Sequence, residues 1–336
     1  MQNTIAGLAV VAGGLLHGSF AAPMKSIEKR WKWENIWLVY SVFALLVFPP
    51  LLALATVPSL AGVYLSTPIS VTLLVAVFGL GWGTGSVLFG QAISRVGMGL
   101  GFAVILGITS TLGSLLPLVV QDPRALWTAK GATLLAGLAI AVCGIVICSA
   151  AGSQRDKESR RAAVPATGGK FITGLLISVA SGLLSPMLNF GFVFGAPLQD
   201  AARAAGASAS LASNAIWAPA LAAGFLVNGG YAIYLLNRNK SWGAFSGGKV
   251  ADWLGGCVMG LLWYGGMSIY GMGAADMGRM GAVIGWPVFM STVIVTANVL
   301  GFLTGEWRYA GPRARAMEWI GIVFLIGAIV VVSRAL

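Results

Sequence analysis

Residues 69–92 read ISVTLLVAVFGLGWGTGSVLFGQA, a stretch without a single charged side chain. An α-helix rises 1.5 Å per residue, so about 20 such residues cross the ~30 Å hydrocarbon core of a bilayer. A helix is expected there because each backbone N–H and C=O then finds its partner inside its own segment. The stretch therefore predicts a transmembrane helix.

The same apolar pattern recurs along the whole chain of 336 residues. Hydrophobic residues make up 57% of it and charged residues 9%, and the mean hydropathy is +0.86. No polar stretch is long enough to form a separate soluble domain, so we predict an all-α membrane protein with short loops. Ten transmembrane helices are expected, over residues 4–22, 35–56, 69–92, 97–120, 128–150, 171–194, 209–236, 251–272, 281–304 and 317–334.

The distribution of basic residues predicts the orientation of these helices. Of the 21 Lys and Arg residues, 16 fall in the loops after the odd-numbered helices. The positive-inside rule places those loops in the cytoplasm and both termini outside. We therefore expect a multi-pass protein of a bacterial-type inner (plasma) membrane with periplasmic termini. The net charge of +11 is interpreted as a topology signal facing anionic membrane lipid, not as a nucleic-acid footprint.

The N-terminal apolar segment follows no Lys or Arg and precedes no small-residue cleavage site. We expect it to be the first membrane helix and not a removable signal peptide. Cys143, Cys148 and Cys257 all lie inside apolar segments, which argues against a disulfide framework and against a metal cluster.

A polar, basic stretch divides the chain in two. Residues 151–170 are predicted to be a basic cytoplasmic linker between a first five-helix repeat at 1–150 and a second repeat at 171–336. Five helices are an odd number, so the second repeat must be inverted. Weak internal similarity supports this, since Ala22-Pro23-Met24 is echoed by Ser185-Pro186-Met187. Inverted repeats are typical of secondary transporters, whose substrate site lies between the halves at the midplane.

Several of the 47 glycines are spaced four residues apart, as in Gly79 and Gly83 or Gly256 and Gly260. Such pairs let a neighbouring helix backbone approach closely. They indicate a tightly packed bundle, and the same smooth faces would allow helices to slide during transport.

Polar side chains at membrane depth are site candidates, because hydrocarbon offers them no partner. His17 is the only histidine, and it titrates near neutral pH, which suits a proton-coupled step. The alternative is a neutral imidazole bonded to a neighbouring helix. The amides Gln91, Asn189 and Asn214 offer uncharged donors and acceptors, which suit a neutral, hydroxyl-rich ligand. Alternatively, such amides hold helices together.

Aromatic side chains add a second candidate surface. Sugar rings present C–H faces that pack on aromatic planes, while tyrosine and tryptophan also offer polar atoms. The alternative is an interfacial belt. The residues predicted to lie within helices and to contact substrate are Trp82, Trp217, Trp263, Tyr264, Tyr270 and Trp286.

No carboxylate is predicted at the bilayer centre. Asp252 and Glu306 are placed at helix ends, where pairing with Lys249 or Arg308 is expected. The chain shows no zinc-spaced ligand set and no nucleophile–base arrangement. We therefore expect no enzyme activity, no catalytic residue, no cofactor, no metal and no obligatory protein partner.

Several segments, taken in order, resemble the L-rhamnose/proton symporter family of the drug/metabolite transporter superfamily. They include Ala22-Pro23-Met24-Lys25, Trp33-Glu34-Asn35-Ile36-Trp37, Trp82-Gly83-Thr84-Gly85 and Gly260-Leu261-Leu262-Trp263-Tyr264. The resemblance implies ten helices in two inverted repeats and uptake of a 6-deoxyhexose with protons. Carried over by position, it points to Trp82, Asn189, Asn228, Trp263, Tyr264, Tyr270 and Trp286.

The sequence thus predicts a secondary active transporter that imports L-rhamnose or a related deoxy sugar with protons by alternating access. The residues themselves leave the sugar and the coupling ion, H⁺ or Na⁺, open. One alternative is an exporter of another small metabolite within the same superfamily. The other is a membrane-embedded enzyme or scaffold, which the missing catalytic constellation disfavours.

Overall fold

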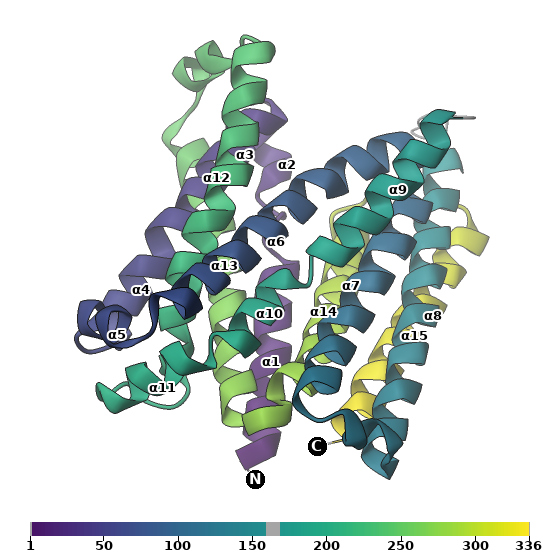
Figure 1. Ribbon diagram of the computed structural model, residues 1–336. Coiled ribbons are helices and arrows are strands. Elements are labelled where there is room, and N and C mark those ends of the chain that lie inside the picture. The colour runs from purple at the N-terminus through teal and green to yellow at the C-terminus, as the bar shows by residue number, and fades with distance from the viewer. Residues whose placement is uncertain (1, 159–168, 336) are drawn as a thin grey trace. The chain divides into compact units, whose positions relative to one another are not determined.

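The computed structural model describes residues 2–158 and 169–335, and within them every regular element is a helix (Figure 1). Helical residues occur in each of the ten expected ranges, although not over their full lengths. The long elements are α1 (Gln2–Gly18), α3 (Trp33–Ser41), α4 (Phe48–Thr56), α6 (Ile69–Val96), α7 (Met98–Gln121), α8 (Ala129–Glu158), α9 (Gly169–Leu184), α10 (Met187–Phe194), α12 (Asn214–Arg238), α13 (Val250–Asp276), α14 (Gly281–Leu303) and α15 (Pro312–Ser333). Three short α-helices are α2 (Met24–Ile27), α5 (Leu60–Ser66) and α11 (Ala196–Ala204).

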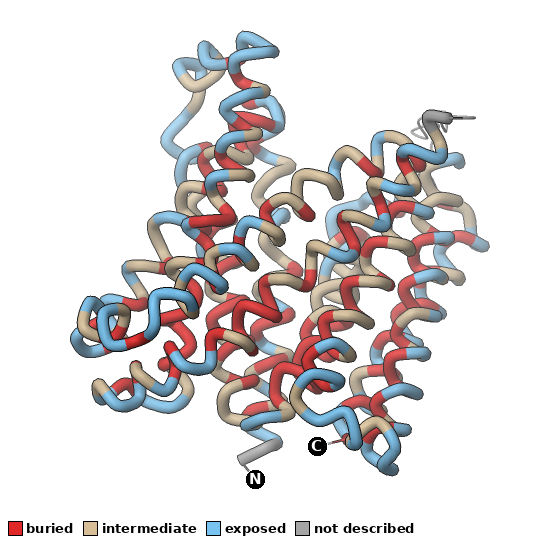
Figure 2. Tube along the Cα trace, viewed as in Figure 1, coloured by how far each residue is buried: buried red, intermediate tan, exposed pale blue. Residues whose placement is uncertain are grey.

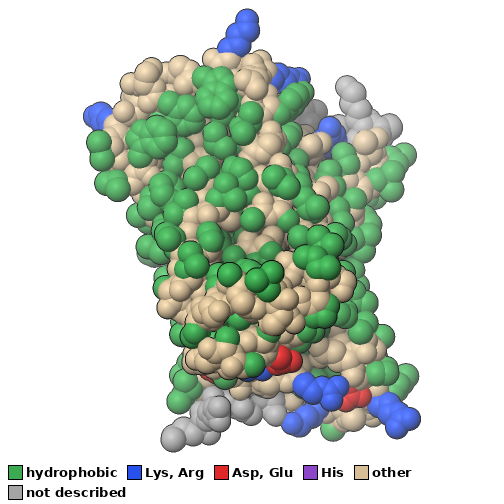
Figure 3. All heavy atoms as spheres, turned by 60° about the vertical axis from the view of Figure 1, so that its left-hand side comes forward, with side chains coloured by type: hydrophobic (Ala, Val, Ile, Leu, Met, Phe, Trp, Pro, Cys, Tyr) green, Lys and Arg blue, Asp and Glu red, His purple; other side chains and the backbone are tan. Residues whose placement is uncertain are grey.

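Within residues 2–158 and 169–335, eight helical stretches are long and apolar enough to cross a membrane. The apolar part of α1, Thr4–Gly18, is shorter, and α13 is not among the eight. Hydrophobic side chains cover most of the face seen in Figure 3, and charged side chains gather toward its two ends. The chain is therefore a multi-pass membrane protein, and its ten-span topology stays a prediction.

The sixth expected helix is interrupted. We predicted one helix over 171–194, but α9 ends at Leu184 and α10 begins at Met187. Pro186 explains the break, because proline has no N–H to donate and its ring clashes with the preceding turn. The first helix also ends earlier than predicted, at Gly18, and turns lead from there to Pro23.

Proline shapes the second expected helix as well. A π-helical segment, Val42–Val47, joins α3 to α4, so the helix continues from Trp33 to Thr56 with one widened turn. Pro49 and Pro50 follow it and cannot donate the backbone bonds of a regular α-helix. Such π segments often accompany functional sites.

The joint between α6 and α7 is tighter than the expected ranges 69–92 and 97–120 imply. Gly97 alone separates the two helices, and its φ of 84° lies in the left-handed region that favours glycine. In the predicted linker, residues 151–158 continue α8, whereas residues 159–168 lie outside the described part of the chain.

The chain forms two compact units, each built from both halves of the sequence. The first unit comprises Met1–Thr84 and Met187–Asp276, and the second comprises Gly85–Pro186 and Met277–Leu336. The predicted repeats at 1–150 and 171–336 concern a duplication of the sequence, whereas these units are defined by contacts in space. The repeats therefore stay a prediction.

Glycine brings backbones together inside the first unit. A Cβ built on Gly266 of α13 would lie 2.5 Å from the Gly13 oxygen of α1, so the two helices touch backbone to backbone. On α6, the predicted pair Gly79 and Gly83 faces α12, where a Cβ would meet the carbonyl oxygens of Ala220 and Gly224. Close packing through small residues is what holds helices together where lipid offers no hydrophobic driving force.

The second unit is packed in the same way. Helix α8 lies along α15, where Gly144 and Gly321 allow the close approach, and α7 contacts α8, α9 and α14. Ile145, Cys148, Ile322 and Leu325 form a buried cluster between α8 and α15. Figure 2 shows buried positions running along the inner faces of these helices, with exposed positions on the outer faces.

The contact between α1 and α13 is testable with two adjacent glycines. In Gly266→Ala the new methyl group meets the Gly13 oxygen and the His17 backbone, and overpacking of this kind destabilises by about 1–3 kcal/mol. We expect a lower melting temperature in detergent. In Gly265→Ala, a Cβ meets no atom within 4 Å, so stability should hold. Equal melting temperatures for both variants would contradict the packing described.

Candidate functional site

Three of the predicted residues meet in the first unit. The Trp82 and Trp263 rings lie 5.1 Å apart, and the His17 and Trp263 rings lie 4.9 Å apart. The residues come from α6, α13 and α1. His17 Nδ1 lies 3.1 Å from the carbonyl oxygen of Trp263. The imidazole of His17 therefore contacts both the indole ring and the backbone of Trp263. Trp263 is buried, whereas Trp82 and His17 are half-buried.

More aromatic residues extend this contact toward α3. The Tyr40 ring lies edge-on to Trp263 at 6.4 Å and 5.4 Å from the Phe20 ring. Trp37 packs against Tyr40 at 5.0 Å and donates through Nε1 to Asn228 Oδ1 at 3.3 Å. We call Trp82, Trp263, His17, Phe20, Tyr40 and Trp37 the aromatic cluster.

A second group of polar side chains surrounds Asn214 in the same unit. Asn214 is buried at the start of α12, and its Nδ2 donates to Thr56 Oγ1 at 3.0 Å. Ser268 Oγ of α13 donates to Asn214 Oδ1, also at 3.0 Å. Both sides of the amide are therefore used to join α12 to α4 and α13.

Two further predicted residues bond directly to each other. The Tyr270 hydroxyl of α13 donates to Asn189 Oδ1 of α10, and both side chains are fully buried. Phe192 connects this pair to Trp217, whose ring stacks on it at 5.7 Å. The bond fastens α10, the short helix after the break at Pro186, to α13.

Among the described residues of this unit, six buried side-chain atoms have no hydrogen-bond partner: Trp31 Nε1, Asn35 Oδ1, Ser41 Oγ, Thr72 Oγ1, Trp217 Nε1 and Tyr264 Oη. Two of them, Tyr264 Oη and Trp217 Nε1, belong to predicted substrate contacts. The neighbouring Tyr64 hydroxyl has a partner, the Ala215 carbonyl oxygen at 2.9 Å. Buried donors are normally satisfied, so unpartnered ones mark places where a ligand or water would bind.

Gln91 and Trp286 belong to the second unit. Trp286 Nε1 donates to the Thr109 carbonyl oxygen at 3.0 Å, and its ring covers Gly113 of α7. Gln91 is half-buried, and its backbone oxygen accepts bonds from Ser94 and Arg95. The indole of Trp286 thus joins α14 to α7.

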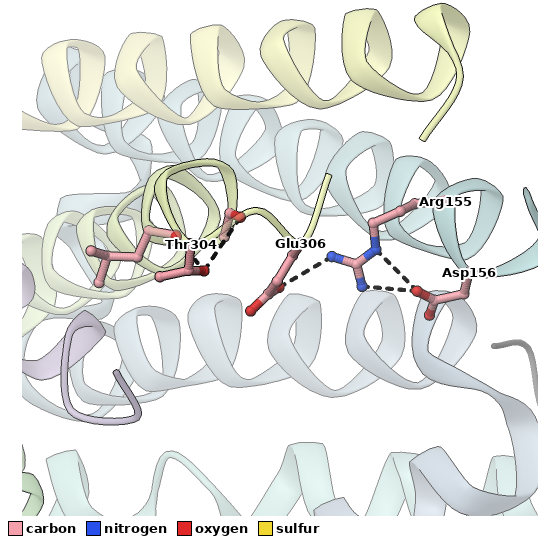
Figure 4. A network of polar contacts seen from close by, with 6 residues as sticks. Arg155, Asp156, Thr304 and Glu306 are labelled. Atoms are coloured by element: carbon pink, nitrogen blue, oxygen red, sulfur yellow. Dashed lines mark hydrogen bonds and ion pairs between the residues drawn. The ribbon is translucent and has the colours of Figure 1, made fainter. Parts of the chain in front are cut away.

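The ion pairs differ from those predicted. Asp252 pairs with Arg30 and accepts the Lys249 backbone N–H, whereas we expected the Lys249 side chain. The hydrogen bond to Asp252 raises the pKa of the Arg30 guanidinium. Glu306 pairs with Arg155 of α8 at 3.3 Å and not with Arg308, as Figure 4 shows. Sequence neighbours were favoured by proximity along the chain, but helix packing brings distant arginines closer.

Sequence reasoning also missed several residues. Thr56, Tyr64 and Ser268 escaped notice because a lone hydroxyl in an apolar segment commonly bonds its own helix backbone. Glu318 was overlooked because it stands at the first turn of the predicted helix 317–334. In the structure α15 begins earlier, at Pro312, and Glu318 is buried within it.

Taken together, the site of the first unit is lined by indoles, phenols, amides and hydroxyls with one imidazole. Among the described residues no group of His, Cys, Asp and Glu is arranged to hold a metal ion. Polar side chains buried inside a membrane-spanning helical bundle mark substrate or ion pathways, which is typical of a transporter.

Comparison with known proteins agrees with this class. The family described as L-rhamnose-proton symport protein (RhaT) matches residues 2–336, and the chain belongs to that family. An L-rhamnose-proton symporter of Klebsiella pneumoniae subsp. pneumoniae is 29% identical over 91% of this chain and 90% of its own length. Those of Citrobacter koseri and Escherichia coli O157:H7 are 27% and 26% identical, over 94% of this chain and 93% of their own lengths.

The Asn214 network gives a stability prediction. Asn214→Ala leaves Ser268 Oγ without its acceptor and Thr56 Oγ1 without its donor, and losing a buried partner costs about 1–3 kcal/mol. We expect a lower melting temperature in detergent. Asn237→Ala is the matched control, because Asn237 lies exposed at the far end of the same helix. A melting temperature no lower than that of the control would show that the network contributes nothing.

Proposed function

We propose that this chain imports L-rhamnose or a related deoxy sugar together with protons, by alternating access. Membership of the family supports the assignment, as do the names of the relatives, each an L-rhamnose-proton symporter. Substrate and proton would shift the populations of outward-open and inward-open states by binding them unequally. No observation favours export of another metabolite.

The observation that carries the proposal is the pair of unpartnered donors beside aromatic planes. Tyr264 Oη and Trp217 Nε1 are buried and unsatisfied. Trp263 precedes Tyr264 on α13, and its ring contacts that of Trp82 on α6. A sugar would satisfy the donors with its hydroxyl oxygens and place its C–H face on an indole. Asn189, Asn214 and Tyr270 would support this surface from behind.

We propose that His17 carries a coupling proton. Its Nδ1 faces the Trp263 carbonyl oxygen. Protonation of the imidazole would therefore change the electrostatic environment of Trp263, a proposed sugar contact. Protonation of His17 and sugar binding at Trp263 would therefore influence each other through direct contact. Gln91 and Trp286, in the second unit, stay predicted substrate contacts.

We also propose ten membrane spans in two inverted five-helix repeats. The packing pairs support this, because the segments that the duplication makes equivalent contact each other. The second and seventh meet as α3 and α4 with α12, the fourth and ninth as α7 with α14, and the fifth and tenth as α8 with α15. The basic loops favour a bacterial-type inner membrane with both termini in the periplasm.

Uptake of labelled L-rhamnose into proteoliposomes tests the function. With an imposed inward proton gradient, the protein should accumulate the sugar above the outside concentration. His17→Gln should still exchange sugar across the membrane but accumulate it less steeply with the gradient, because Gln cannot bind a proton. Gradient-independent uptake by the unmodified protein would refute proton coupling, and full accumulation by His17→Gln would remove His17 from it.

Tyr264→Phe separates a ligand contact from a structural one. The hydroxyl has no partner in the protein, so its removal should leave the melting temperature unchanged or slightly raised. Binding of L-rhamnose should weaken roughly tenfold, about 1.4 kcal/mol, as measured by tryptophan fluorescence titration.

Tyr64→Phe is the matched control for this measurement. The Tyr64 hydroxyl donates to the Ala215 carbonyl oxygen, so its loss should lower the melting temperature. If Tyr264→Phe behaves like Tyr64→Phe and binds sugar normally, the Tyr264 hydroxyl has a structural role and is not a sugar contact.

A further inference from the structure

Glu318 is a buried carboxyl group within the membrane-spanning helix α15. It lies about two turns after the helix begins at Pro312, and its exposed fraction is 1%. Neither Oε1 nor Oε2 has a hydrogen-bond partner. A carboxylate with no donor in an apolar setting is strongly disfavoured relative to the neutral acid.

The surroundings of Glu318 come from α8 and α14 in the same unit. The Cys148 thiol of α8 lies against the carboxyl group without reaching hydrogen-bond geometry, and Asn298 of α14 approaches the same thiol. Gly321, one turn along α15, has no side chain, and a Cβ there would lie 2.4 Å from Cys148 Sγ. Ile145, Ile322 and Leu325 complete an apolar setting.

The nearest cation is already engaged by other groups. Arg155 of α8 lies within electrostatic reach of Glu318, but its guanidinium bonds Asp156 at 2.9 Å and Glu306 at 3.3 Å (Figure 4). It also lies 5.0 Å from the centre of the Trp307 ring. The titratable groups facing Glu318 are thus Cys148 and Arg155, with Glu306 competing for the arginine.

We propose that Glu318 is a second proton-binding group of the transport cycle, in addition to His17. The carboxyl group holds a proton while Arg155 stays bound to Glu306. When Arg155 leaves Glu306 and turns toward Glu318, the carboxylate gains a counter-ion and releases the proton to water. Only an O–H bond breaks and re-forms, and no other reactant takes part. This inference rests on the proposed function, because it assigns one of the coupled protons.

The number of coupled protons tests the proposal. At zero membrane potential, the logarithm of the steady-state accumulation of L-rhamnose rises with the pH difference, with a slope equal to the protons carried per sugar. Glu318→Gln should lower that slope by one, which is about tenfold less accumulation for each unit of pH difference. Glu318→Leu fits the apolar surroundings and should show the same lowered slope as Glu318→Gln. Glu28→Gln, at an exposed carboxylate, should keep the original slope.

Infrared difference spectroscopy provides a readout that does not depend on transport. A pH titration of the purified protein should show the C=O band of a protonated carboxyl group that is absent in Glu318→Gln and present in Glu28→Gln. An unchanged slope in both Glu318 variants, or a band that persists in Glu318→Gln, would overturn the proposal. If the unmodified protein accumulates no sugar, the proposed function fails, and the infrared band still decides whether Glu318 binds a proton.

Discussion

A bilayer interior offers no water, so each buried polar atom must find its partner within the protein. Several polar side chains in the described part of the chain meet that demand by bonding the backbone of a neighbouring helix. Ser114 donates to the Val283 oxygen, Trp286 to the Thr109 oxygen and Tyr64 to the Ala215 oxygen. These bonds use the donors of the side chains to fix helix pairs. Buried donors that remain without a partner, such as Tyr264 Oη and Trp217 Nε1, are therefore available to a ligand.

Glycine makes this arrangement possible by setting the distance between helices. Gly266 is one turn from Trp263, and there the backbone of α13 touches the backbone of α1 at Gly13 and His17. A larger residue would push α1 outward and separate the imidazole from the Trp263 carbonyl. The aromatic cluster thus depends on a residue that has no side chain. In the second unit, Gly321 likewise leaves room for the Cys148 side chain, which lies beside Glu318.

Much of the fold could be predicted from the sequence, because bilayer thickness and backbone satisfaction leave few choices for an apolar segment of about 20 residues. The break at Pro186 and the widened turn before Pro49 depend on local geometry that hydropathy does not report. Of the site residues, His17, Trp82 and Trp263 were predicted and do meet. Both Tyr270 and Asn189 were predicted as site residues, but their hydrogen bond to each other follows from the packing of α10 on α13, which hydropathy does not report. Helix packing also decides which predicted residues share a unit. Gln91 and Trp286 belong to the second unit, whereas the other predicted site residues belong to the first.

Coupling requires that one ligand change the affinity for the other, and the two proposed proton groups would do so by different means. His17 touches the backbone of a residue in the proposed sugar surface, so its charge acts over a single contact. Glu318 is enclosed by α8, α14 and α15, so its proton can act only through a change in their packing or in the partner of Arg155. Such a change is a two-state event, because the arginine bonds either Glu306 or the buried carboxylate. A direct contact in one unit and a switch of ion-pair partner in the other would together bias the same transport cycle.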